Sequence, residues 1–198
     1  MANTNTPFGF SQTRGTGSAP TYEQVPALIA STNSTAIFFG DPVVQLSTGY
    51  IAQASSNSAA NGVGGIFVGC QYLSTSQKRT VWSNYWPGSD ANGDVTAYII
   101  NDPNAQFLVQ SGGSTTTAIG IADVGANIGF AVGTGNTASG ISAAYADQTT
   151  IQTTNTLPFR IVGLVATPPG APGTDTTSPY NRIIVAFNNV ATKQLTAI

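Results

Sequence analysis

The feature that most restricts the fold of this chain is the brevity of its apolar runs. Stretches such as GIFVGCQYL, QFLVQ and RIIVAFNNV recur along the sequence, and Gly, Pro, Asn or Ser separates each from the next. Many short strands at near-regular spacing, with turn residues between them, are typical of a β sandwich or a closed barrel. We therefore predict an all-β fold, a sandwich or barrel, and we find no fixed-period repeat that would indicate a solenoid or propeller.

Several strands can be placed from the sequence. Strands are expected over residues 36–39 and 43–46, separated by Gly40, Asp41 and Pro42, and over residues 65–73. QFLVQ predicts another strand, which ends at Gly112-Gly113. Pro26 within EQVPALIA removes one backbone donor and favours an edge strand. LPFRIVGLV and RIIVAFNNV predict a closing pair of strands, and KQLTAI a last edge strand.

Other segments are expected to be less regular. Asn92-Gly93 is a turn signal and predicts a hairpin or tight corner between RTVWSNYW and VTAYIINDP. Alternating Gly and apolar residues over 115–137 predict irregular or bulged strands. The small polar residues 47–64 predict a loop, and ISAAYAD is the one stretch that favours a helical turn.

The length of 198 residues allows a core without a metal or disulfide. We divide the chain into an extended N-terminal arm, residues 1–20, and a single β domain, residues 21–198. The arm is rich in Thr, Ser, Asn and Gly around Phe8 and Phe10, whose rings require burial against this domain or a neighbour. We expect deletion of the arm to leave the domain folded and to weaken binding to a partner.

Charge is the most unusual property of the composition. Charged residues make up 7% of the chain, against about a quarter in an ordinary globular protein. The net charge is −2, so the surface consists mainly of Thr, Ser, Asn, Gln and Gly and does not keep molecules apart by repulsion. Such a surface suits a protein that binds copies of itself or a partner. An ordinary polar β domain is the alternative.

The sequence offers little for catalysis or cofactor binding. It has no His and a single Cys, Cys70, which excludes an internal disulfide and a cysteine-based zinc site. We interpret Cys70 as a small apolar strand residue. A carboxylate pair could hydrolyse glycosides, but Asp41, Asp90, Asp94 and Asp102 stand where turns are expected. DANGD resembles the start of a calcium loop, yet Asn101 stands where the acid would be needed. We expect no enzyme activity, no cofactor and no metal.

Partners of several classes are also not expected. The N-terminus has neither a basic nor an apolar segment of a secretion signal, and no apolar run approaches the length of a membrane span. The six basic residues are scattered, which leaves no footprint for nucleic acid.

WSNYWPG is the most distinctive local cluster. Trp82, Tyr85 and Trp86 could be core anchors, the centre of a protein interface, or a platform that stacks against sugar rings. Strand alternation would place Trp82 and Trp86 on the same face, with at least one of them buried.

The order of several stretches resembles a family of tailed-phage virion proteins. These stretches are NTPFGF, AIFFGDPVVQL, GIFVGCQYL, WSNYWPGSD, AYIINDPNAQFLVQ, VGANIGF, GTGNTASGISAAYAD and LPFRIVGLV. The family comprises capsid cement or decoration proteins. The resemblance implies a jelly-roll-like sandwich or related barrel, without catalytic residues. It also implies a homo-oligomer, dimer or trimer, made in the host cytoplasm, that binds the major capsid protein on the outer surface of the virion and bridges capsomers.

Two surfaces are candidates for contacts in such a role. The uncharged loop 167–180 could project as a contact finger or be an idle surface loop. We take the following residues as candidate interface positions: Phe8, Phe10, Trp82, Tyr85, Trp86, Pro168, Pro169 and Pro172. The alternative function is a tail or appendage component that binds carbohydrate through Trp82, Tyr85 and Trp86. A small glycosidase that uses aspartates is a third hypothesis.

Overall fold

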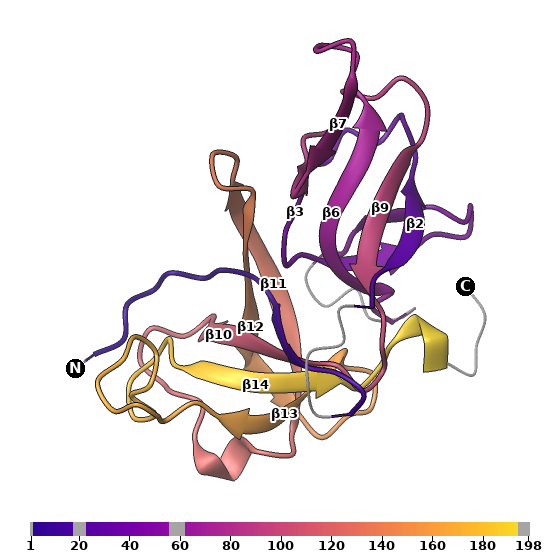
Figure 1. Ribbon diagram of the computed structural model, residues 1–198. Coiled ribbons are helices and arrows are strands. Elements are labelled where there is room, and N and C mark those ends of the chain that lie inside the picture. The colour runs from indigo at the N-terminus through magenta and orange to yellow at the C-terminus, as the bar shows by residue number, and fades with distance from the viewer. Residues whose placement is uncertain (1, 18–22, 56–61, 194–198) are drawn as a thin grey trace.

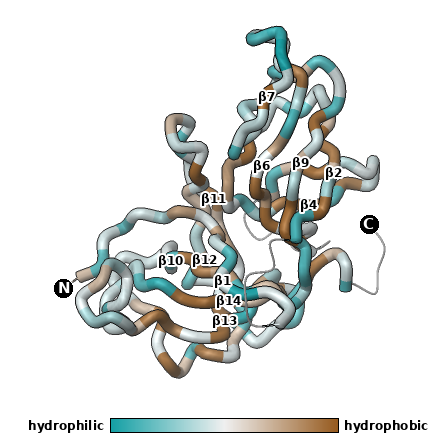
Figure 2. Tube along the Cα trace, viewed as in Figure 1, coloured by the Kyte–Doolittle hydropathy of each residue, from teal (hydrophilic) through white to brown (hydrophobic). Residues whose placement is uncertain are grey.

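The computed structural model describes residues 2–17, 23–55 and 62–193. The chain is all-β, as predicted, with several sheets in a sandwich-like arrangement (Figure 1). Apolar stretches fall on strands such as β6 (Gly65–Leu73), β11 (Asn127–Asn136) and β14 (Arg182–Phe187), whereas the turn that joins β6 to β7 (Thr80–Ser83) is strongly hydrophilic (Figure 2). Among the described residues, no helix is long and apolar enough to cross a membrane.

The first sheet forms the lower part of the molecule in Figure 1. Its strand order is β1 (Ser11–Arg14), β10 (Gln106–Gly112), β12 (Ile141–Gln152), β11, β13 (Phe159–Leu164) and β14. Because β14 also pairs with β10, the last five of these strands form a closed ring. Alternate residues of each strand point inward, and the rings of Phe107, Phe130, Phe159 and Phe187 pack against one another there.

The second sheet forms the upper part and has its own apolar cluster. Its order is β2 (Val25–Ile29), β9 (Val95–Ile100), β6, β4 (Pro42–Gln45) and β5 (Ile51–Gln53), and β7 pairs with β6. A short pair, β3 (Ile37–Phe38) and β8 (Tyr85–Trp86), packs beside it. Two short 3-10 turns, η2 (Ile121–Asp123) and η3 (Ala191–Lys193), complete the described elements.

Asp41 connects the two sheets. Its buried carboxylate accepts hydrogen bonds from the Phe38 amide at 2.8 Å, Gln53 Nε2 at 2.7 Å and Ser142 Oγ at 2.5 Å. Ser142 belongs to β12 of the first sheet, whereas Gln53 belongs to β5 of the second. Burial raises the pKa of Asp41, and the three donors oppose this effect. The carboxylate therefore does more than begin the local turn expected from its place before Pro42.

The N-terminal arm is part of the first core. Residues 2–10 have no regular secondary structure, and the chain then pairs with β10 as β1. Phe10 is 1% exposed and stacks on Phe159 with 4.5 Å between ring centroids. The arm packs closely against the turn before β4 because Gly9 and Gly40, both at positive φ, meet there without side chains. A Cβ on Gly9 would lie 2.8 Å from the Ser142 Cβ. The arm is extended, but its end fills the interior of the ring.

Several strand predictions are confirmed. The expected strand over residues 65–73 is β6, and QFLVQ begins β10. Pro26 lies in β2, which is an edge strand of the second sheet. The closing pair is β13 and β14, antiparallel to each other. Register shifts within β11 confirm the irregularity expected before residue 137.

Other predictions are wrong in instructive ways. ISAAYAD is not helical but begins β12, whose burial alternates with a period of two residues. The expected loop 47–64 contains β5. Of the two alternatives for Asn92-Gly93, a hairpin or a tight corner, the structure shows the corner, because β7 pairs with β6 and not with β9. Of KQLTAI, only Lys193 lies within the described residues.

Candidate functional site

The aromatic cluster of WSNYWPG divides between surface and core. Asn84 interrupts the strand after Ser83, and Tyr85 then begins β8, which pairs with β3. The expectation that Trp82 and Trp86 share a face is therefore wrong. Trp82 is 67% exposed, whereas Trp86 is fully buried and packs edge-to-face on Tyr72 with 5.1 Å between ring centroids.

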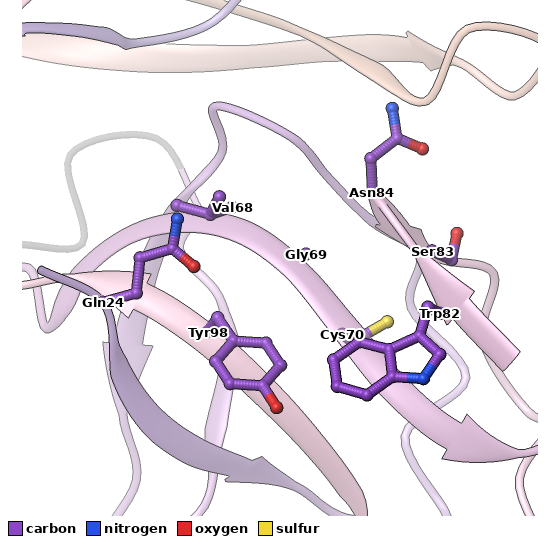
Figure 3. Close-up of a pocket in the computed structure, with 8 residues that line it drawn as sticks. All are labelled: Gln24, Val68, Gly69, Cys70, Trp82, Ser83, Asn84 and Tyr98. Carbon is purple, nitrogen blue, oxygen red and sulfur yellow. The ribbon is translucent and has the colours of Figure 1, made fainter. Parts of the chain in front are cut away.

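Trp82 lies beside a ring that the sequence did not single out. Its ring centroid is 6.0 Å from that of Tyr98 on β9, and the two planes differ by 11°. Strand β6 runs between them and places Gly69 opposite Tyr98 in the pairing register. Gly69 has no side chain to separate the rings, and a Cβ there would lie 2.9 Å from the Ser83 carbonyl oxygen. The rings lie side by side with their faces turned the same way (Figure 3). We call this pair, Trp82 and Tyr98, the aromatic platform.

The platform borders a hollow of about 500 Å³. Among the described residues, its lining contains no charged side chain and consists of Gln24, Val68, Gly69, Cys70, Trp82, Ser83, Asn84 and Tyr98. Gln24 lies near Tyr98, and Ser83 and Asn84 lie on the Trp82 side (Figure 3). Asn84 is held in place because its amide donates to the Ser139 carbonyl at 2.8 Å. The hollow is therefore an apolar surface with neutral amide and hydroxyl groups at its edge.

A second hollow of about 280 Å³ adjoins the first, since Gln24 and Val68 line both. It lies between β1 and the second sheet, where Ser11, Gln12 and Ile100 contribute to its walls. Gln24 and Val68 stand on the border that the two hollows share, and we call the two hollows together the track.

Cys70 does not make this site reactive. Its thiol is buried and donates weakly to the Tyr85 carbonyl oxygen at 3.5 Å. Burial raises the pKa of Cys70 to about 12, so the nucleophilic thiolate does not form near neutral pH. The residue is the small apolar strand residue that the sequence predicted.

A second candidate surface forms where the N-terminal arm meets the loop between β13 and β14. Asn3 Nδ2 donates to the carbonyl oxygens of Asp175, Ser178 and Pro179 at 2.8, 3.2 and 3.1 Å. Gln110 holds the same two segments, because its Nε2 donates to the oxygens of Thr4 and Tyr180. We call these joined segments, residues 2–8 and 165–181, the neutral ridge.

The neutral ridge contains one charged side chain, Asp175. Its carboxylate accepts hydrogen bonds from the Thr177 hydroxyl at 2.6 Å and from Ser178 Oγ at 2.8 Å. These bonds, those from Thr177 above all, lower the pKa of Asp175 to about 2. The carboxylate is therefore bonded within its own loop, and the other side chains of residues 2–8 and 165–181 are uncharged, although the Arg182 guanidinium borders the ridge over Phe8.

The predicted interface residues fall into four groups, of which one is buried. Pro168, Pro169 and Pro172 are exposed on the neutral ridge, and Phe8 is half-buried there with the Arg182 guanidinium 5.1 Å from its ring centroid. Trp82 belongs to the platform. Tyr85 is half-buried and stacks on Phe38 at 5.5 Å.

Phe10 and Trp86, by contrast, lie in the two cores, so we reassign both from contact residues to core residues. Tyr98, Gln24 and Asn3 also belong to these surfaces, although the sequence did not single them out. Tyr98 pairs with Gly69 only through the long-range register of β6 and β9, and no local pattern reveals that pairing.

Asp90, Asp94 and Asp102 accept hydrogen bonds from neighbouring groups in the structure. Asp90 accepts hydrogen bonds from Ser74, Thr75 and Ser76, and the bond from Ser74 does most to lower its pKa to about 2. Asp94 accepts from the Tyr50 hydroxyl at 2.8 Å, and Asp102 binds Thr16 and the Asn104 amide. No group of three or more potential metal ligands occurs among the described residues.

Comparison with protein-family models, with curated proteins and with solved structures finds no match to this chain. The function is therefore argued from the sequence and from the two surfaces described above.

Proposed function

We propose that this chain is a non-enzymatic structural protein of a phage virion, a capsid cement protein that binds the outer shell and bridges neighbouring capsomers. The observation that carries the proposal is the neutral ridge, a contact surface built from two segments that lie outside the regular strands. The order of the sequence stretches that resemble cement proteins supports the same role.

The ridge is suited to docking because much of its order exists before binding. Asn3 and Gln110 hold the arm against the loop, and three prolines restrict the exposed part of the loop. A surface that is already ordered loses less conformational entropy when a partner covers it. Each copy bound to the mature shell then stabilises that shell by its binding free energy.

Repetition strengthens modest contacts of this kind. A homo-oligomer that touches several capsomers gains avidity, because its second contact is made at a high effective concentration. The proposed partners are accordingly the major capsid protein and other copies of this chain.

The first test is the copy number in purified particles of the phage that encodes the chain. Quantitative mass spectrometry against the major capsid protein should give a copy number comparable to that of the capsid protein. A handful of copies per particle, or none, would overturn the cement role.

A binding experiment tests the ridge itself. Shells that lack the protein should bind the wild type, and a variant with Pro168, Pro169 and Pro172 replaced by Ser should bind more weakly with an unchanged melting temperature. Leu73→Ser is the matched control, because Leu73 is an exposed apolar residue on β6, in the other sheet. Equal binding by the wild type and the proline variant would contradict the ridge as the contact surface.

A further inference from the structure

We infer that the aromatic platform and the adjoining track bind a neutral oligosaccharide, with one pyranose ring stacked on Trp82 and Tyr98. This activity goes beyond a cement role, and its site lies apart from the neutral ridge.

The exposure of the platform is the first argument. Trp82 is 67% exposed, although burial of a Trp ring would be strongly favourable. Other large rings in the chain, such as Trp86, Phe67 and Phe107, are fully buried. The platform is thus an apolar surface available to a partner, and its flatness restricts what that partner can be.

The geometry of the two rings favours a flat, partly apolar ligand. The two rings are parallel within 11° and offset from each other, with 6.0 Å between their centroids, so together they extend the aromatic surface beyond a single ring. The C–H face of a pyranose packs on such a surface, while its hydroxyl groups point outward to hydrogen-bonding partners. Gly69 keeps the floor between the rings free of any side chain.

The lining determines the charge of the ligand. No Lys, Arg, Asp or Glu lines the main hollow, so neither a phosphate nor a carboxylate would find a counter-charge there. This argues against single-stranded nucleic acid, which also stacks on aromatic rings but requires a basic groove. Gln24, Ser83 and Asn84 supply the amide and hydroxyl groups that a neutral sugar uses.

The size of the site favours an oligosaccharide over a single sugar. The main hollow, of about 500 Å³, falls in the range of small-ligand sites, roughly 300–1,000 Å³. The adjoining hollow, of about 280 Å³, extends it past Gln24 and Val68 toward Ser11. A second sugar unit can therefore follow the first along the track, and longer oligosaccharides should bind more tightly than disaccharides.

The test uses the isolated full chain, so its result does not depend on the proposed capsid role. Neutral β-linked glucose and galactose oligosaccharides, from di- to hexasaccharides, are titrated by calorimetry and by tryptophan fluorescence. Trp86 is fully buried, so a fluorescence change on binding reports mainly on Trp82. We expect binding that strengthens with oligosaccharide length and a decreased quenching of tryptophan by iodide.

Variants identify the platform as the site. Trp82→Ala and Tyr98→Ala should each weaken binding by roughly tenfold, the loss expected for one stacking contact and its buried area. Trp82→Phe should restore part of the affinity because it keeps a flat ring. Ile121→Ala is the control, since Ile121 is 80% exposed on η2 and lies outside both hollows. All variants are compared at equal melting temperature.

Three results would overturn the inference. The first is that the wild type binds no oligosaccharide in the panel. The second is that Trp82→Ala binds as tightly as the wild type. The third is that no sugar binds and the wild type self-associates, and that Trp82→Ala abolishes this self-association. The last result would assign the platform to a contact between copies of the chain.

Discussion

Asp41 shows how a single residue can join two parts of an all-β chain. Turn chemistry explains why an aspartate precedes Pro42, but it does not explain three hydrogen-bond donors from three different strands. The cost of burying a carboxylate is offset only when such donors surround it. Asp41 therefore fixes the position of β12 relative to β4 and β5.

The raised pKa of Asp41 predicts a pH-dependent effect of Asp41→Asn. In the folded protein the pKa lies above the ordinary value of 3.8, so the folded chain holds a proton that the unfolded chain has lost. The contribution of Asp41 to stability is full below about pH 3.8 and declines as the pH rises through the raised pKa. Asn does not titrate, so the stability advantage of the wild type over Asp41→Asn should shrink as the pH rises above about 4. Urea unfolding at several pH values measures this difference, and an advantage that grows with pH would contradict it.

Phe10 carries a second prediction at the residue scale. Its ring contacts Phe107, Phe130 and Phe159 inside the first sheet. Phe10→Ala should therefore lower the free energy of unfolding by about 3–5 kcal/mol, the usual cost of a large core truncation. Phe8→Ala is the control, because Phe8 is half-buried on the ridge and should cost much less. Chemical denaturation measures the free energy of unfolding of both variants. An equally small decrease for Phe10→Ala and Phe8→Ala would contradict the core role of Phe10.

At the scale of elements, the N-terminal arm differs most from its sequence-based interpretation. Its many small polar residues suggested an extended segment whose deletion would leave the domain folded. In the structure, β1 pairs with β10 and Phe10 completes the first core. We now expect deletion of residues 1–20 to destabilise the fold, because it removes a strand and a buried ring together.

Local sequence predicted which segments become strands far better than it predicted their partners. Strand β6 follows from its β-branched and aromatic residues, and the pair β13 and β14 from two apolar runs around a turn-rich loop. The platform depends instead on strand pairing, because β7 and β9 flank β6 and so bring Trp82 and Tyr98 together. ISAAYAD was misread because its small residues permit a helical turn, whereas pairing with β11 fixes it as a strand.

The neutral ridge predicts a specific result for Asn3→Ala. This change removes the donor that binds three carbonyl groups of the β13–β14 loop. Hydrogen exchange should become faster at the loop amides, including that of Asp175, which donates to Asn3 Oδ1. Exchange in β6 should not change, because that strand lies in the other sheet. Unaltered loop exchange would mean that Asn3 does not hold the ridge together.

The whole molecule combines two apolar clusters with very little charge. Each sheet encloses its own buried cluster. The hydrogen bonds of Asp41 and the close contact between Gly9 and Gly40 link the two sheets. With a net charge of −2 and 7% charged residues, the fold does not depend on networks of ion pairs at its surface. With so few charged residues, exposed segments such as the neutral ridge consist mainly of Thr, Pro, Gly and Asn.

The low charge also predicts how the proposed binding to a shell would depend on salt. Screened Coulomb attraction weakens steeply over ordinary ionic strengths, because the Debye length falls from about 10 Å at 0.1 M to about 3 Å at 1 M salt. The neutral ridge has only Asp175, and that carboxylate is bonded within its own loop. The affinity for shells should therefore change by less than about threefold across this range, whereas a steered, charge-driven contact would lose far more. Co-sedimentation with shells at several NaCl concentrations measures the dependence. As a control, Thr176→Lys adds a charge to the ridge and should make binding salt-dependent. A steep loss of wild-type binding in high salt would place the contact on some other, charged part of the surface.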